Sequence, residues 1–125
     1  EPFPAGAYVL IADDFTNSGS TLFGGAEIIR RHSAGSLRVH AYVTHFVAKY
    51  SSATVSKFID TLYADKAPLD VFHCTDSVCG IAAELKRKSE ERANGEPHKV
   101  HVHPVAPLIA DWLIHNPPPA ATGLQ

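Results

Sequence analysis

Two adjacent carboxylates, Asp13 and Asp14, follow a short apolar run and precede a loop rich in hydroxyl groups. A segment with helical spacing comes next, and a loop at the start of a helix presents backbone N–H groups and the positive end of the helix dipole to an anion. The carboxylates would repel that anion, so they suit sugar hydroxyl groups or a divalent cation. A phosphorylated sugar fits both parts of this site, because its phosphate suits the loop and its hydroxyl groups suit the carboxylates. The loop residues are Asn17, Ser18, Gly19, Ser20 and Thr21.

A purely structural interpretation of the same residues is that the carboxylates end a strand and that Ser18 or Ser20 caps the helix, because Ser and Asp are common at such places. One residue is enough for a cap, whereas this loop has several polar side chains. The pattern therefore favours a phosphosugar site.

Strand-like and helix-like segments alternate along the chain, which predicts parallel strands joined by right-handed crossovers. We expect an α/β fold with three layers, helix–sheet–helix, and a mainly parallel sheet of about four to five strands. The strand candidates are residues 8–12, 37–44, 69–74 and 99–103, and the helix candidates are residues 20–33, 52–63 and 79–93 and an amphipathic stripe over residues 105–113.

Parallel sheets bind ligands at the carboxyl ends of their strands, near a switch in strand order. This rule places the acidic pair and its loop at the same edge as the polar residues that end two later strands. His45 and Asp76 are therefore further candidate site residues. His101 and His103 share one face of the last strand, but two imidazoles without a carboxylate make an incomplete metal site.

The acidic pair and loop resemble the ribose-5-phosphate-binding motif of the phosphoribosyltransferases and the ribose-phosphate pyrophosphokinases (PRPP synthetases). That motif has an apolar strand, two acidic residues, three variable residues, Thr-Gly or Thr-Ala, one more residue and Thr. Ser18 stands where the family usually has Thr, and Ser20 stands where synthetases usually have Gly. Later segments favour the synthetases: Thr44-His45-Phe46 is similar to their Thr-His-Gly, and Thr75-Asp76-Ser77 to their Thr-Asp-Ser.

The resemblance implies a phosphoribosyltransferase-like domain over residues 1–115, forming the C-terminal half of a longer protein. Residues 116–125 have almost no core-forming side chains, so we expect a disordered tail there. It implies diphosphate transfer from ATP to ribose 5-phosphate, giving PRPP for nucleotide biosynthesis, by a homo-oligomeric protein. Asp13 and Asp14 would bind the ribose hydroxyls, directly or through Mg²⁺. Residues 17–21 would hold the 5-phosphate. ATP would be bound mainly by parts absent from this chain, so we expect the chain alone to be inactive.

Two alternatives remain. A fragment of a type I phosphoribosyltransferase would share the acidic pair and the loop but would bind a nucleobase. A non-catalytic, regulatory subunit similar to PRPP synthetase would keep the fold without the reaction.

The composition excludes several other classes of function. The chain has 125 residues, 45% of them hydrophobic, and a net charge of −2, so neither nucleic acid nor an anionic membrane is an expected partner. No apolar run approaches the roughly 18 residues that cross a bilayer. Cys74 and Cys79 lack the spacing of a disulfide framework or a zinc site. We expect free, buried or half-buried thiols and a cytoplasmic location.

Overall fold

The computed structural model describes residues 1–117, which are built around a parallel sheet of four strands in the order β1-β2-β3-β4. The predicted α/β fold with a mainly parallel sheet is confirmed. The strands are β1 (Tyr8–Thr16), β2 (Arg38–Phe46), β3 (Val71–Thr75) and β4 (Val100–His103). The helices are α1 (Ser20–Arg31), α2 (Ser52–Leu62), α3 (Cys79–Ala93) and α4 (Val105–His115), with a short 3-10 turn η1 (Ala48–Tyr50) before α2.

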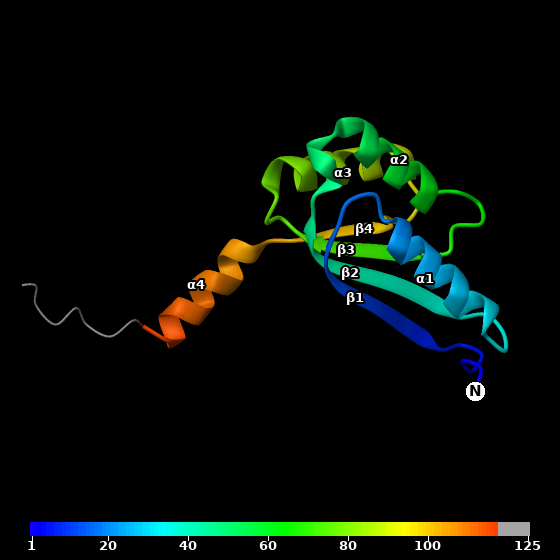
Figure 1. Ribbon diagram of the computed structural model, residues 1–125. Coiled ribbons are helices and arrows are strands. Elements are labelled where there is room, and N and C mark those ends of the chain that lie inside the picture. Colours follow the sequence, from blue (N-terminus) through cyan, green and yellow to red (C-terminus); the bar gives the residue numbers. More distant parts are fainter. Residues whose placement is uncertain (118–125) are drawn as a thin grey trace, which may run out of the picture.

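Three helices form a layer on one face of this sheet. Each crossover moves one strand further in the same direction, so right-handed connections place α1, α2 and α3 on the same side (Figure 1). Helix α4 leaves the end of β4 and extends away from the sheet (Figure 1). Within residues 1–117, helices α1–α3 leave the opposite face of the sheet uncovered. The strand order also has no reversal, so the expected switch point is absent among these strands.

The hydrophobic core lies between the sheet and α1–α3. In β2 the side chains of Val39, Ala41 and Val43 alternate with half-buried neighbours and are fully buried. Phe58 of α2 lies at the centre of an aromatic cluster, with ring centroids 4.6 to 5.2 Å from those of its three aromatic neighbours. These neighbours are Phe23, Phe46 and Phe72. The helix layer is therefore packed tightly against the strand ends that the site uses.

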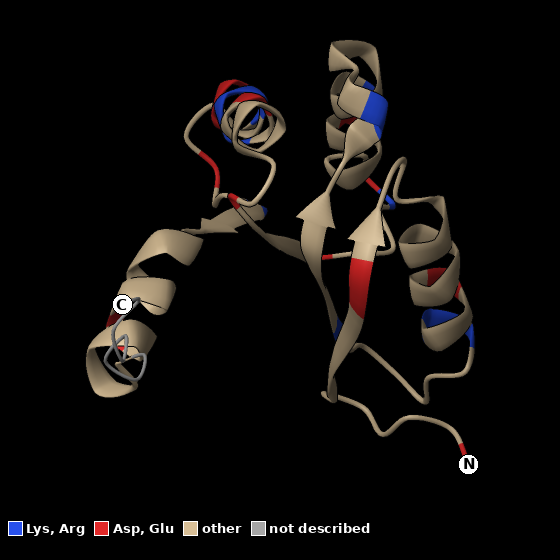
Figure 2. Ribbon diagram, turned by 60° about the vertical axis from the view of Figure 1, so that its left-hand side comes forward, with Lys and Arg blue, Asp and Glu red and all other residues tan. Residues whose placement is uncertain are grey.

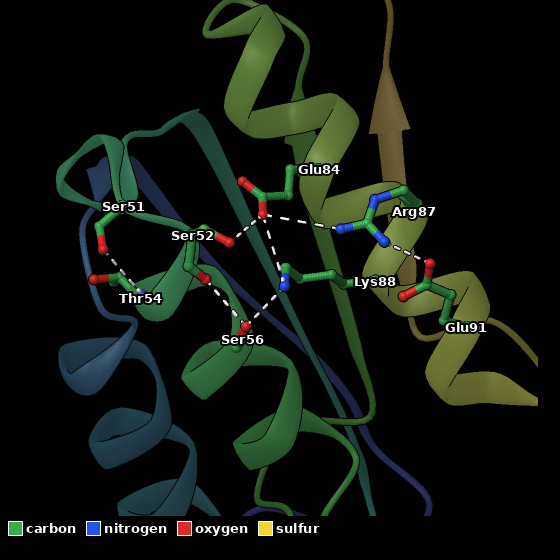
Figure 3. A network of polar contacts seen from close by, with 8 residues as sticks. All are labelled: Ser51, Ser52, Thr54, Ser56, Glu84, Arg87, Lys88 and Glu91. Atoms are coloured by element: carbon green, nitrogen blue, oxygen red, sulfur yellow. Dashed lines mark hydrogen bonds and ion pairs between the residues drawn. The ribbon is translucent and has the colours of Figure 1, made fainter.

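A polar network joins α2 to α3 (Figure 3). The Lys88 ammonium donates a 2.9 Å hydrogen bond to Ser56 Oγ and lies 3.7 Å from the Glu84 carboxylate. Glu84 in turn accepts a hydrogen bond from the Ser52 hydroxyl. The charged part of α3, whose role the sequence leaves open, thus ties two helices of the layer together in addition to facing solvent.

Helix α4 is the one helix of residues 1–117 that contributes nothing to the core. None of its residues is buried, and Trp112 is 61% exposed. The predicted amphipathic helix is present, but Trp112 is not a core residue of this chain. The start of α4 is fixed by Asp76, whose carboxylate accepts a 2.8 Å hydrogen bond from the Val105 backbone N–H.

The two cysteines are free, as expected. Cys74 is buried, and this burial raises the pKa of its thiol to about 12, which makes the thiol unreactive. Cys79 is exposed, so the expectation of a buried or half-buried thiol is wrong at this position, because Cys79 begins α3 at its solvent side. Among residues 1–117 no helix has the length and apolar character needed to span a bilayer. From residue 118 onwards, the predicted disordered tail lies outside the described residues.

The face of the sheet opposite the helices carries a row of histidines. His40 of β2 and His73 of β3 are half-buried, and His101 and His103 of β4 are exposed. Burial and the neighbouring imidazoles of His101, His103 and His40 lower the pKa of His73 from 6.5 to about 4. Burial also lowers the pKa of His40, against the opposing charge of Asp70.

These shifts predict that acid destabilises the fold. Between pH 6.5 and about 4 an unfolded chain binds a proton at His73 that the folded chain does not, so the free energy of unfolding falls as the pH falls through this range. Urea titrations at several pH values, with a chelator present, measure this loss. His73→Phe is expected to flatten part of the profile, because it removes the group whose pKa is lowered. An unchanged slope in His73→Phe would contradict the prediction.

Candidate functional site

The acidic pair lies within β1 and does not follow it. The sequence predicts a strand that ends at residue 12, but β1 continues to Thr16 because Asp13, Phe15 and Thr16 pair with Val43, His45 and Phe46 of β2. Successive side chains of a strand alternate between its faces. The Asp13 and Asp14 side chains therefore leave the backbone on opposite sides. Both residues lie toward the carboxyl end of an edge strand, where Figure 2 shows an acidic segment in red.

Each carboxylate uses one oxygen to hold the local backbone. The Asp14 backbone N–H donates to Asp13 Oδ1 at 2.9 Å, and the Phe15 N–H donates to Asp14 Oδ1 at 2.8 Å. Both carboxylates are exposed. Each second oxygen therefore faces solvent and can accept a hydrogen bond from a ligand or coordinate a cation.

The loop after β1 is held from within by Thr16 and Gly19. Thr16 is buried, and its Oγ1 accepts a 3.2 Å hydrogen bond from the Gly19 N–H. Gly19 has a φ of +76°, and a Cβ built on it would lie 2.5 Å from the Phe58 ring. Glycine is therefore required here both by the left-handed backbone and by the packed core beneath it. The crowding comes from the aromatic core of the protein itself.

The start of α1 offers free hydrogen-bond donors. The first bond of the helix runs from the Phe23 N–H to the Gly19 carbonyl at 2.9 Å, and the N-cap Gly19 provides no side-chain cap. The N–H groups of Thr21 and Leu22 consequently have no protein acceptor among residues 1–117. The first turn of α1 also has no acidic residue. This end of α1 therefore combines free donors with the positive end of a helix dipole.

Ser18 and Ser20 contact each other across the loop. The Ser18 hydroxyl donates to Ser20 Oγ at 3.2 Å, and the Ser20 backbone N–H is directed at Ser18 Oγ at 3.4 Å. Ser20 is the residue at which this chain departs from the glycine of the synthetases. The Ser20 side chain therefore engages the Ser18 hydroxyl, which would otherwise be free to donate a hydrogen bond to an incoming phosphate.

A cavity of about 420 Å³ brings the predicted site residues together. Of the acidic pair and loop residues that the sequence predicts, Gly19 does not line the cavity. The six that do are Asp13, Asp14, Asn17, Ser18, Ser20 and Thr21. Phe15 and Thr16 complete the lining. The acidic pair and the donor-rich loop thus line one shared cavity at the carboxyl edge of the sheet.

Sequence reasoning missed two lysines beside this cavity. A second cavity of about 300 Å³ is lined by Ser18, which also lines the first, and by Lys49 and Lys57. The Lys49 N–H donates a 3.3 Å hydrogen bond to Asn17 Oδ1. Lys49 could have been found, because it closely follows the strand end at Thr44-His45, and its positive charge favours an anion near the loop.

The turn that carries Lys49 has an unusual backbone. Ala48, Lys49 and Tyr50 have φ values of 47°, 51° and 50°, which is the left-handed region that non-glycine residues rarely adopt. Such strain is often found at functional sites. Here it places Lys49 against the loop that follows β1.

His45 and Asp76 do not line the 420 Å³ cavity. His45 Nδ1 lies 2.7 Å from the Ser77 hydroxyl, and its backbone pairs with Phe15 of β1. The Asp76 carboxylate is engaged by the start of α4. His45 therefore remains close to the edge of the site, whereas the observed role of Asp76 is to cap a helix.

No family model matches the chain. Comparison with curated proteins finds similarity to a ribose-phosphate pyrophosphokinase of Hyphomonas neptunium (strain ATCC 15444), with 31% identity over 108 residues. The match covers 86% of this chain and 28% of that protein, in its C-terminal part. The ribose-phosphate pyrophosphokinase 4 of Arabidopsis thaliana is 45% identical over 49 residues, which are 39% of this chain and 14% of that protein.

These two matches confirm the resemblance that the motifs indicate. Over most of its length the chain is a relative of the ribose-phosphate pyrophosphokinases, and it spans about 28% of the length of the first relative.

Proposed function

We propose that this chain, a relative of part of the ribose-phosphate pyrophosphokinases, forms the ribose-5-phosphate-binding half of an active site. The complete protein would transfer diphosphate from ATP to the 1-hydroxyl of ribose 5-phosphate and so produce PRPP. The observation that carries the proposal is the cavity of about 420 Å³ that both the acidic pair and the loop line.

The residues would have separate tasks at the two ends of the sugar. The free N–H groups of Thr21 and Leu22 and the hydroxyls of Ser18 and Thr21 would hold the 5-phosphate at the start of α1. Asp13 and Asp14 would accept hydrogen bonds from ribose hydroxyls through their solvent-facing oxygens. The sugar oxygen itself attacks the β-phosphorus of ATP and AMP leaves, so no protein nucleophile is needed. Catalysis would rest on positioning and charge neutralisation.

The donor set of the acidic pair fits Mg²⁺, which binds through one or two carboxylates together with substrate oxygens. Asp13 and Asp14 would hold the ion, and the ion would supply positive charge near the ribose hydroxyls. The same proposal includes ATP as the second substrate, a cytoplasmic location and a homo-oligomeric assembly.

Titration calorimetry with ribose 5-phosphate tests this function, with and without Mg²⁺. We expect weak binding that Mg²⁺ strengthens, and much weaker binding of ribose or of inorganic phosphate alone, because each engages only one half of the site. Equal binding of ribose 5-phosphate and inorganic phosphate, with no effect of Mg²⁺, would argue against a role of the acidic pair in sugar binding.

Ser20 provides a second test of the phosphate half. Ser20→Gly removes the hydroxyl that contacts Ser18 Oγ and introduces the residue usual in synthetases, so we expect it to tighten ribose 5-phosphate binding by about three- to tenfold, equivalent to about 0.6 to 1.4 kcal/mol. Ser36→Gly is a matched control, because Ser36 precedes β2 at the amino ends of the strands. It should leave ribose 5-phosphate binding unchanged. Weaker binding in Ser20→Gly would mean that the Ser20 hydroxyl is itself a phosphate ligand.

The same contact favours one alternative, a non-catalytic subunit that keeps the fold. In such a subunit the loop would no longer need an open phosphate cradle, and a Ser18–Ser20 contact would be tolerated. The calorimetric titration separates the two functions, because the non-catalytic subunit would bind ribose 5-phosphate no better than inorganic phosphate.

A further inference from the structure

The cavity proposed for ribose 5-phosphate has a negatively charged lining. Asp13 and Asp14 line it, and among residues 1–117 no Lys, Arg or His does. A phosphate monoester carries a charge of about −1.5 to −2 at pH 7. Mg²⁺ at the acidic pair would offset charge at the sugar end, but the phosphate end has only backbone dipoles and neutral hydroxyl groups. A cation beside the loop would therefore strengthen phosphate binding.

The second cavity, of about 300 Å³, brings two such cations beside the loop. Lys49 and Lys57 line it together with Ser18, Ala53 and Thr54. Ser18 lines the first cavity as well, so the two cavities adjoin at a residue whose hydroxyl is proposed to hold the phosphate. Among residues 1–117 neither of these lysines takes part in an ion pair, although other lysines of the chain do. Their positive charge is therefore available to a ligand.

Lys49 is held against the loop by its backbone. Its N–H donates a 3.3 Å hydrogen bond to Asn17 Oδ1, and Asn17 itself lines the first cavity. The left-handed turn at residues 48–50 fixes this position. A lysine ammonium sits on a flexible four-carbon stem. The Lys49 ammonium can consequently approach a phosphate bound at Ser18 without any movement of the backbone.

Lys57 lies one turn after Ala53 in α2. Residues four apart share one face of a helix, which is why both line the same cavity. The first turn of α2 contains no acidic residue, so nothing there offsets the positive end of the helix dipole. This partial charge adds to the charges of the two ammonium groups. The second cavity is therefore positive where the first is negative.

We infer that Lys49 and Lys57 are phosphate-binding residues of the ribose 5-phosphate site. This inference rests on the proposed function and extends the site across Ser18 into the second cavity. The 5-phosphate lies between the N–H donors of α1 and the two ammonium groups. Because charge-assisted contacts of this kind form only with an anion, the lysines select a phosphorylated sugar over a neutral one.

Calorimetric titration with ribose 5-phosphate and Mg²⁺ at low salt tests the inference. Lys49→Met and Lys57→Met should each weaken binding by about three- to tenfold, and the double variant by more than either alone. Methionine keeps the unbranched stem, and both lysines are exposed, so thermal unfolding should show an unchanged fold. Lys49→Arg, which keeps the charge, should retain most of the affinity.

Lys66→Met is the matched control and should leave binding unchanged. Lys66 is exposed and lies between α2 and β3, before the amino end of β3, whereas the site lies at the carboxyl ends of the strands. Its substitution removes the same charge as the other two variants. The control thus separates a local contact from a general effect of net charge.

The salt dependence of binding is a readout that a merely structural role would not change. Added NaCl should weaken binding by the unchanged chain more than binding by the double variant, which has lost the charges that salt screens. Unchanged affinity in both single variants would overturn this inference and leave the proposed function standing. No binding of ribose 5-phosphate by the unchanged chain would overturn both.

Discussion

The double substitution Asp13→Asn with Asp14→Asn should abolish measurable Mg²⁺-dependent binding of ribose 5-phosphate and leave the fold intact. Two charge-assisted hydrogen bonds to the ribose are worth about 1.5 kcal/mol or more each, so their loss corresponds to an affinity at least about 100-fold lower. The fold should persist because both carboxylates are exposed and an asparagine Oδ1 can still accept the N–H groups of Asp14 and Phe15. Calorimetry and thermal unfolding measure the two effects.

The matched control is Asp60→Asn with Asp65→Asn, which changes the net charge equally at two exposed positions outside the cavity. It should leave binding unchanged, which separates a local effect of the acidic pair from a general effect of charge. If the Asp13/Asp14 variant lost several degrees in its thermal midpoint, the pair would be structural and the proposed role of its carboxylates would be wrong.

Gly19→Ala should be the most damaging single substitution in the loop. A positive φ costs a non-glycine residue about 1 kcal/mol, and forcing a methyl group into a packed core costs about 1 to 3 kcal/mol, so we expect a loss of about 2 to 4 kcal/mol in the free energy of unfolding. The added Cβ would lie 2.5 Å from Phe58 and 2.9 Å from Phe23. Chemical denaturation measures the loss.

Gly24→Ala, within helix α1 that follows the loop, provides the control. Gly24 has no positive φ, and an added Cβ would have no atom within 4 Å. Alanine there should stabilise the protein by about 0.5 to 1 kcal/mol, because it restricts the unfolded chain and favours the helix. Similar effects of the two substitutions would contradict the conformational role assigned to Gly19.

Local patterns were enough to predict the strand, loop and helix that carry the site. The acidic pair, the loop residues and the start of α1 are neighbours in the sequence, so their arrangement follows from one turn. The length of β1 could not be predicted, because Asp is unfavourable in strands and only pairing with β2 extends the strand to Thr16. The position of Lys49 could not be predicted either, because its left-handed turn contains no glycine that would indicate such a backbone from the sequence.

Features that depend on strand order were beyond the sequence. Alternation of strands and helices predicts parallel pairing but does not determine that the order β1-β2-β3-β4 places α1–α3 on a single face. The histidine row has the same origin. The spacing of His101 and His103 places them on one face, but their contact with His73, and through it with His40, requires the register of three strands.

The central claim is that the start of α1 binds the phosphate of ribose 5-phosphate while the acidic pair binds its hydroxyls. Amide chemical shifts of the ¹⁵N-labelled chain test it most directly, in a titration with ribose 5-phosphate and Mg²⁺. We predict the largest changes at the amides of Thr21 and Leu22, with smaller ones at Asp14 and Phe15, whose N–H groups bond to the acidic pair. Saturating ribose 5-phosphate that leaves these four amides unshifted, or shifts only amides elsewhere, would contradict the account.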